Sequence, residues 1–283
     1  MKVRKPYVAN AFYAGTRATL TNQIRDCFTH KFGPGQVPKA NASGPRKILG
    51  IVSPHAGYMY SGPVAANGFA RLASDGCPGT FIILGPNHTG QGSGVSILTN
   101  GAWETPIGTS EVQSELAKRI KESNSLLDVD EASHAYEHSI EVQLPFLQFL
   151  YGDAVKFIPT CMMMQDLKTS REIAKSIVEQ CKGKDYVIIA SSDFTHYEPQ
   201  ESANKKDKMA IEAILRLDDE ALNDLGESNS VTMCGYGPIT TLIAAAKILT
   251  GVKAELLTHR TSGDITGDKS AVVGYSSIVF TRE

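Results

Sequence analysis

The sequence has 283 residues, of which 42% are hydrophobic and 20% charged, so the chain is long enough to bury a sizeable core. Its formal net charge is −2 and it contains no long run of Lys or Arg, which disfavours binding to nucleic acid or to an anionic membrane surface. No apolar run reaches the length of a membrane span, and no apolar stretch follows the basic start, so we expect neither a membrane segment nor a secretory signal.

The predicted elements alternate between strands and helices along most of the chain. A stretch from Gly33 to Pro45, rich in Gly, Pro and Asn, is interpreted as a surface loop. Apolar, β-branched runs predict strands at Ile48–Ser53, Phe81–Leu84, Val155–Thr160 and Tyr186–Ala190. Helical patterns occur at Val64–Ser74, Glu111–Glu122, Glu137–Leu150, Lys168–Gln180, Asp207–Arg216 and Ile239–Leu249.

The last predicted elements differ from the rest. Ala254–His259 and Val272–Phe280 flank a turn rich in Gly and Asp, which predicts an antiparallel C-terminal hairpin. The strand–helix alternation before them predicts an α/β fold with a mainly parallel central sheet and helices on both faces. We expect residues 1–283 to form a single domain of this kind.

The five cysteines give an indication of the cellular compartment. They are scattered and form no Cys-x-x-Cys pair, which favours reduced thiols in the cytoplasm over a disulfide framework. They are Cys27, Cys77, Cys161, Cys181 and Cys234.

Three of the predicted strands are followed by loops that contain histidine. His55 lies in the loop after the first strand, His88 follows the second, and His196 follows the strand that ends near Ala190. Ligands of parallel sheets bind at the carboxyl ends of the strands, so these side chains are expected to share one edge of the sheet. A single histidine after a strand is usually a loop residue without a catalytic or binding role, whereas three in equivalent places favour a metal site.

Two further segments belong to this candidate site. His138 and Glu141 are three residues apart in a predicted helix and would share one of its faces, although acidic residues at a helix start also simply favour the helix dipole. Cys234 lies between Met233 and Gly235 just before a predicted helix, whose N-terminus would lower the pKa of the thiol. The alternative for a cysteine, a buried inert thiol, suits the other four better.

Motifs for other chemistries are absent from the sequence. It contains no Gly-x-Ser-x-Gly elbow, no Walker loop and no complete Gly-x-Gly-x-x-Gly. Nucleotide binding and serine-hydrolase chemistry are therefore disfavoured.

Five ordered motifs resemble those of the Memo family, named after a mediator of cell motility. They are Pro54–Tyr58, Gly85–His88, Glu137–Glu141 with Leu144-Pro145, Ser191–His196 and Cys234-Gly235, and the resemblance extends over essentially the whole chain. It implies a fold related to the class III extradiol dioxygenases, in which two histidines and a glutamate hold Fe(II). The Memo pattern has a cysteine in place of that glutamate.

The resemblance also implies roles for individual residues. On that basis His55, His88 and Cys234 are the metal ligands, while Asp193 and His196 line the same cleft. We expect Fe(II) or copper, with zinc as a third option. His196, oriented by Asp193, would act as general acid and base. His138 and Glu141 would support the ligands from behind.

The expected function is that of a metal-dependent redox protein of unknown substrate. The rival is a binding protein that uses the same cleft without turnover, to hold a peptide or phosphate group or to pass on a metal ion. A small molecule or peptide is the expected partner, and family gene context adds a radical S-adenosylmethionine enzyme. Nucleic acid and membranes are not expected partners.

Overall fold

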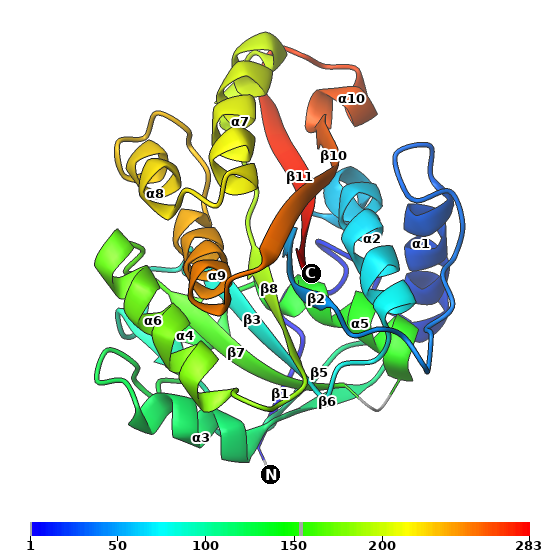
Figure 1. Ribbon diagram of the computed structural model, residues 1–283. Coiled ribbons are helices and arrows are strands. Elements are labelled where there is room, and N and C mark those ends of the chain that lie inside the picture. Colours follow the sequence, from blue (N-terminus) through cyan, green and yellow to red (C-terminus); the bar gives the residue numbers. More distant parts are fainter. Residues whose placement is uncertain (1, 153–154) are drawn as a thin grey trace.

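The computed structural model describes residues 2–152 and 155–283, and these residues form an 11-stranded sheet covered by helices (Figure 1). The main path of the sheet runs β1-β5-β6-β7-β3-β8-β2-β11-β10, with β4 paired to β7 and β9 paired to β11. The strands are β1 (Val3–Arg4), β2 (Ile48–Ser53), β3 (Thr80–Pro86), β4 (Val95–Ile97), β5 (Ala102–Glu104), β6 (Thr109–Val112), β7 (Lys156–Met162), β8 (Tyr186–Ser191), β9 (His196–Glu198), β10 (Val252–Thr261) and β11 (Val272–Arg282).

The centre of the sheet is parallel, as the alternating pattern predicts. β7, β3, β8 and β2 are parallel neighbours, and every residue of β2, β3 and β8 is buried. Strands buried on both faces are nearly continuous apolar runs, which is why these four strands could be recognised in the sequence. The C-terminal hairpin is confirmed, because β10 pairs antiparallel with β11 and β11 with β2.

Helices cover both faces of the sheet, which confirms the predicted fold class. α9 packs on β2, β3 and β8 and also contacts α6, while α2 packs on β2 and β11 and contacts α1 and α5. The helices are α1 (Arg17–Thr29), α2 (Tyr58–Asp75), α3 (Ser114–Glu122), α4 (Ala132–Ala135), α5 (Leu144–Tyr151), α6 (Leu167–Gln180), α7 (Gln200–Leu215), α8 (Asp219–Glu227), α9 (Tyr236–Leu249) and α10 (Ser262–Thr266), with a 3₁₀ turn η1 (Glu141–Gln143).

Two of the predicted helices are wrong in part. The segment Glu137–Leu150 is helical only from Leu144, after η1, because the Glu137 carboxylate takes the backbone N–H groups of residues 138 and 139 and so forms a turn. Pro145 then suits the first turn of α5. In Glu111–Glu122, the first residues belong to β6, which pairs with β5 and β7, and α3 begins at Ser114.

None of the helices in the described part of the chain is long and apolar enough to span a membrane.

Candidate metal centre

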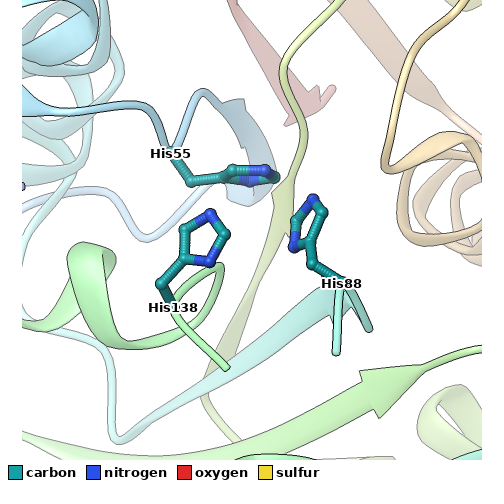
Figure 2. A group of neighbouring side chains, drawn as sticks. All are labelled: His55, His88 and His138. Atoms are coloured by element: carbon teal, nitrogen blue, oxygen red, sulfur yellow. The ribbon is translucent and has the colours of Figure 1, made fainter. Parts of the chain in front are cut away.

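Histidines from three separate segments meet at the carboxyl edge of the parallel strands. His55 follows β2, His88 follows β3, and His138 lies in the turn between α4 and η1. One ring nitrogen from each of these three residues lies within 4.8 Å of the others, so the group could hold a metal ion. Figure 2 shows their rings gathered around a common space. His138, expected to support the ligands from behind, therefore lies in this histidine cluster itself.

Ser191, the last residue of β8, fixes the tautomer of His55. Its hydroxyl group donates to the carbonyl oxygen of Ser139 at 2.6 Å and accepts from Nε2 of Gln143 at 2.9 Å. Because the hydroxyl proton is used, Ser191 Oγ must also accept from Nδ1 of His55, which lies 2.9 Å away. Nε2 of His55 therefore carries the lone pair that can bind a metal ion.

The buried carboxylate of Glu137 orients the ring of His88 and lies near that of His138. Its Oε1 lies 3.0 Å from Nδ1 of His88 and 3.4 Å from Nδ1 of His138. Burial raises the pKa of Glu137, but the hydrogen bond from His88 and the nearby rings outweigh burial and hold this pKa at about 2. The ionised carboxylate can only accept a hydrogen bond, so the Nδ1–H group of His88 is the donor to Glu137. The lone pair of His88 Nε2 is then available to a metal ion.

Burial keeps two of the rings neutral. It lowers the pKa of His55 well below the usual value, and the neighbouring His88 and His138 lower it further. Burial also lowers the pKa of His138 to about 4, although Glu137 acts in the opposite direction. Neutral imidazole is the form that binds metal ions, so at neutral pH neither ring has to lose a proton before it binds one.

Cys234 lies beside the cluster, two residues before α9. Its Sγ is 3.1 Å from Nε2 of His55, and the backbone N–H of Asp193 donates to Sγ at 3.3 Å. Burial, followed by the charge of Asp193, raises the pKa of the Cys234 thiol. The expected lowering by a helix N-terminus is therefore wrong, because desolvation of the thiolate is the larger effect. The contact with His55 keeps Cys234 a candidate ligand.

His196 lines the same cleft, but Asp193 does not orient it. The Nδ1–H of His196 donates to the carbonyl oxygen of Thr232 at 2.8 Å, and its backbone N–H donates to Thr232 Oγ1 at 2.8 Å. The Asp193 carboxylate instead accepts from the backbone N–H of His55 at 2.8 Å. Burial, acting against this hydrogen bond, raises the pKa of Asp193 to about 6. The predicted orientation of His196 by Asp193 is wrong, because Thr232 holds the imidazole through Nδ1 and leaves Nε2 free.

Glu141 does not line the cleft. Its fully buried carboxylate pairs with Arg4 at 2.7 Å and accepts from the Tyr13 hydroxyl at 2.6 Å and from the backbone N–H of Val8 at 3.0 Å. The expected common face of His138 and Glu141 is wrong, because these residues are not in one α-helix. Glu141 instead fastens the N-terminal segment to the body of the protein.

An open cleft of about 890 Å³ contains the cluster, together with Cys234, Asp193 and His196. Its walls are largely aromatic and apolar, with a polar end near α10. Within residues 2–152 and 155–283, no Lys or Arg lines this cleft. The wall residues on which the argument depends are Phe12, Met59, Tyr60, Tyr197 and Tyr275, with Thr266 and Asp268 at the polar end.

Three residues orient the histidines through hydrogen bonds, and the sequence does not reveal this role for any of them. The pattern indicates Glu137 only as an acid at a helix start, Ser191 only as the first residue of a motif, and Thr232 not at all. Their side chains act across the fold, because Ser191 reaches back 136 positions to His55 and Thr232 reaches 36 positions to His196. The one local signal is the Glu137-His138 pair, which places a carboxylate next to an imidazole.

Comparison with known proteins identifies the family of the chain. A sequence profile of the family described as Memo-like protein matches residues 4–279. The chain is 49% identical over 281 residues to a MEMO1 family protein of Methanopyrus kandleri, covering 99% of both chains, and 45% identical to one of Methanothermobacter thermautotrophicus, covering 98% of this chain and 99% of that one. The crystal structure of an uncharacterized protein from Escherichia coli K12 has the same fold at 12% identity, with a TM-score of 0.55 over 82% of this chain and 99% of that one.

Proposed function

This chain belongs to the Memo family, and we propose that it is a redox protein that holds Fe(II) or copper in the cleft. The observation that carries the proposal is the convergence of three imidazoles from separate segments, two of which have Nδ1 hydrogen-bonded to a protein acceptor. Imidazole suits iron, copper and zinc. When bound, such an ion supplies redox chemistry and polarises a substrate oxygen.

His55 and His88 are common to the ligand set implied by the family resemblance and to the cluster, so they are the core of the proposed site. His138 and Cys234 both lie close enough to His55 to complete it. A soft thiolate favours Cu(I), whereas imidazole serves Fe(II) and zinc as well. We therefore expect copper to use Cys234 and Fe(II) to use His138.

His196 provides a proton acceptor next to the proposed ligands. Its Nδ1–H is held by Thr232, which leaves the lone pair of Nε2 available on a side chain that lines the cleft. A histidine fixed in this way can take a proton from a substrate hydroxyl or thiol group. The aromatic wall near Tyr60 and Tyr275 favours a substrate with a flat apolar part.

The rival function is binding of a peptide or a phosphate group without turnover, or transfer of a metal ion, and its phosphate-binding form lacks the side chains that it needs. Phosphate recognition usually depends on Arg or Lys, and none lines the cleft among the residues that the structure describes. Binding of a peptide in the cleft, and storage or transfer of a metal ion by the cluster, are the forms of the rival function that the cleft would serve.

Anaerobic metal loading followed by oxygen-uptake measurement tests the proposal. We expect one equivalent of Fe(II) or copper per chain, and oxygen uptake with a reductant or a phenolic compound that disappears in His196→Ala. Stoichiometric metal without uptake for any reductant or phenol would support metal transfer instead. Absence of bound metal would contradict both functions.

The choice of third ligand has its own test. Cys234→Ala should lower the affinity for Cu(I) at least about tenfold, as expected for loss of a ligand, and change the affinity for Fe(II) less. His138→Ala should show the reverse order. Equal losses of both metals in both variants would contradict the division between the two ligands.

A further inference from the structure

Tyr197 is the most exposed of the tyrosine and phenylalanine residues that line the metal cleft. It is 79% exposed, whereas Phe12 and Tyr60 are partly buried and Tyr275 is 2% exposed. Its ring lies next to that of His196, with the two centroids 5.7 Å apart. A single exposed ring is common on protein surfaces and does not by itself indicate a binding role.

The backbone of Tyr197 is also unusual, because it is left-handed with a φ of 59°. Residues with a Cβ atom disfavour this region, and bulky side chains rarely adopt it. Leu217, Asn229 and Thr250 share the conformation, but they lie just after helices α7, α8 and α9, where a left-handed residue commonly ends a helix. Tyr197 follows no helix, so its conformation needs another explanation.

A β-bulge in β9 produces the left-handed conformation. His196 pairs with Val273 and Glu198 pairs with Val272, so three residues of β9 oppose two of β11 and Tyr197 is the extra one. Bulges are frequent next to active sites, where they redirect a side chain. In this protein the bulge places Tyr197 in the wall of the cleft that His196 also lines.

Both neighbours of Tyr197 are held in place by polar contacts. The backbone N–H of His196 donates to Thr232 Oγ1 at 2.8 Å, and the carboxylate of Glu198 pairs with Lys206 at 2.6 Å. A disfavoured backbone conformation persists only where the surrounding structure holds it. The fold therefore keeps Tyr197 in a conformation that costs stability while its ring gains little from burial, which points to a ligand that covers the ring.

We propose that Tyr197 binds the substrate of the cleft by stacking on a flat, uncharged ring, while an alcohol group of the same substrate donates to Nε2 of His196. Stacked rings attract each other beyond the effect of buried area alone. Within residues 2–152 and 155–283 no Lys or Arg lines the cleft, which disfavours an anionic ring. This inference rests on the proposed function, since it concerns the substrate of the same cleft.

Calorimetry with 2-naphthalenemethanol and the purified chain, without added metal, tests the role of Tyr197. We expect a Kd of about 1 mM or below, as is usual for a molecule of this size. Tyr197→Asn should lower the affinity at least about fivefold, whereas Tyr197→Phe keeps the ring and should stay within about twofold of the wild type. Decahydronaphthalene-2-methanol has the same carbon skeleton without a flat ring and should bind the wild type at least about fivefold more weakly.

Thermal unfolding of the same variants separates substrate binding from a structural role. Asn tolerates the left-handed region, so Tyr197→Asn should raise Tm by about 1–3 °C while it weakens binding. The matched control is Thr250→Asn, at an exposed left-handed position after α9, which should raise Tm similarly and keep the full affinity. A lower Tm in Tyr197→Asn would make Tyr197 a structural residue and overturn the proposal.

Three binding results would also overturn the proposed role of Tyr197. They are no measurable binding of 2-naphthalenemethanol to the wild type, unchanged affinity in Tyr197→Asn, and equal affinity of the wild type for the two compounds. Because calorimetry needs neither metal nor turnover, a chain that binds 2-naphthalenemethanol through Tyr197 but takes up no metal would contradict the proposed function alone. A chain that loads metal but fails the binding test would contradict only the role of Tyr197.

Discussion

His55 and His134 are both buried histidines, yet the protein holds them in opposite tautomers. Ser191 accepts from Nδ1 of His55 and leaves Nε2 free beside Cys234, whereas Ser96 accepts from Nε2 of His134 and leaves Nδ1 free. His55 is part of a group of imidazoles that could hold a metal ion, while His134 lies against a tryptophan whose nitrogen is also unpaired. The hydrogen-bond partner of a histidine, more than its burial, therefore determines which chemistry it can perform.

The largest expected effect is the loss of metal when two histidines of the cluster are replaced. His55→Ala/His88→Ala should lower metal affinity by at least about a hundredfold, since each change removes a proposed ligand and even a change behind a ligand costs roughly 10–100-fold. Metal content after anaerobic loading and gel filtration measures this loss. The matched control is His30→Ala, a histidine at the end of α1 that does not line the cleft, and it should keep full metal content. A double variant with full content would place the metal elsewhere.

Glu137→Gln should have the next largest effect. It keeps the shape of the side chain but removes the ionised acceptor that orients His88 and lies near His138, so we expect metal affinity to fall roughly 10–100-fold. In the metal-free protein, Glu137→Gln should also change how the free energy of unfolding depends on pH. The folded-state pKa of about 2 lies below the ordinary 4.5, so the carboxylate stabilises the fold above about pH 4.5 and that stabilisation is lost as pH falls toward 2.

Urea unfolding of the metal-free proteins at several pH values measures the signature of Glu137. Between pH 4.5 and 2, the free energy of unfolding of the wild type should fall by at most about 3 kcal/mol more than that of Glu137→Gln. This bound follows because each tenfold difference in proton affinity between the folded and unfolded chains corresponds to about 1.4 kcal/mol. Parallel pH profiles for the two proteins would mean that Glu137 is not held ionised by the rings.

His196→Ala should affect metal binding less than either change above. Its imidazole is held by Thr232 and is not part of the cluster, so metal affinity is expected to stay within about tenfold of the wild type. Any turnover should fall by roughly 10²–10⁴, the usual contribution of a general acid or base. Both quantities are measured on one preparation. Loss of metal would make His196 a ligand, and unchanged turnover would remove its proposed role in proton transfer.

The smallest expected effect is that of His134→Phe on the metal centre. His134 and Trp103 line a second cavity that shares no lining residue with the cleft, so metal affinity should change less than about twofold, as is usual for sites without common partners. Competition with a chelator measures the difference. A loss as large as that of Glu137→Gln would show that the two histidine environments are coupled through the turn between residues 134 and 138.

The sheet and part of the candidate site could be predicted because their signals are local. β2, β3 and β8 are continuous apolar runs, and His55 and His88 directly follow two of them. The strand-end rule for parallel sheets then brings both histidines to one edge without further information. β1 could not be predicted, since two residues make no pattern. α1 could have been predicted, since Leu20, Ile24, Cys27 and Phe28 recur at helical spacing after the N-cap Thr16.

The contacts that orient the side chains could not be predicted, because they join distant parts of the chain. Sequence proximity pairs Asp193 with His196, but the Asp193 carboxylate accepts from the backbone of His55, 138 positions away. Helical spacing places Glu141 near the cleft, but a turn replaces that helix and Arg4 takes the carboxylate. Each error arises where one buried carboxylate has to satisfy backbone N–H groups that the sequence pattern does not reveal.

Anomalous diffraction at the metal edge tests the central claim most directly, using crystals grown anaerobically with Fe(II) and, separately, with Cu(I). We expect one strong anomalous peak bonded to His55 and His88, with His138 as the further ligand for Fe(II) and Cys234 for Cu(I). A peak that is not bonded to both His55 and His88, or no peak at full metal loading, would contradict it.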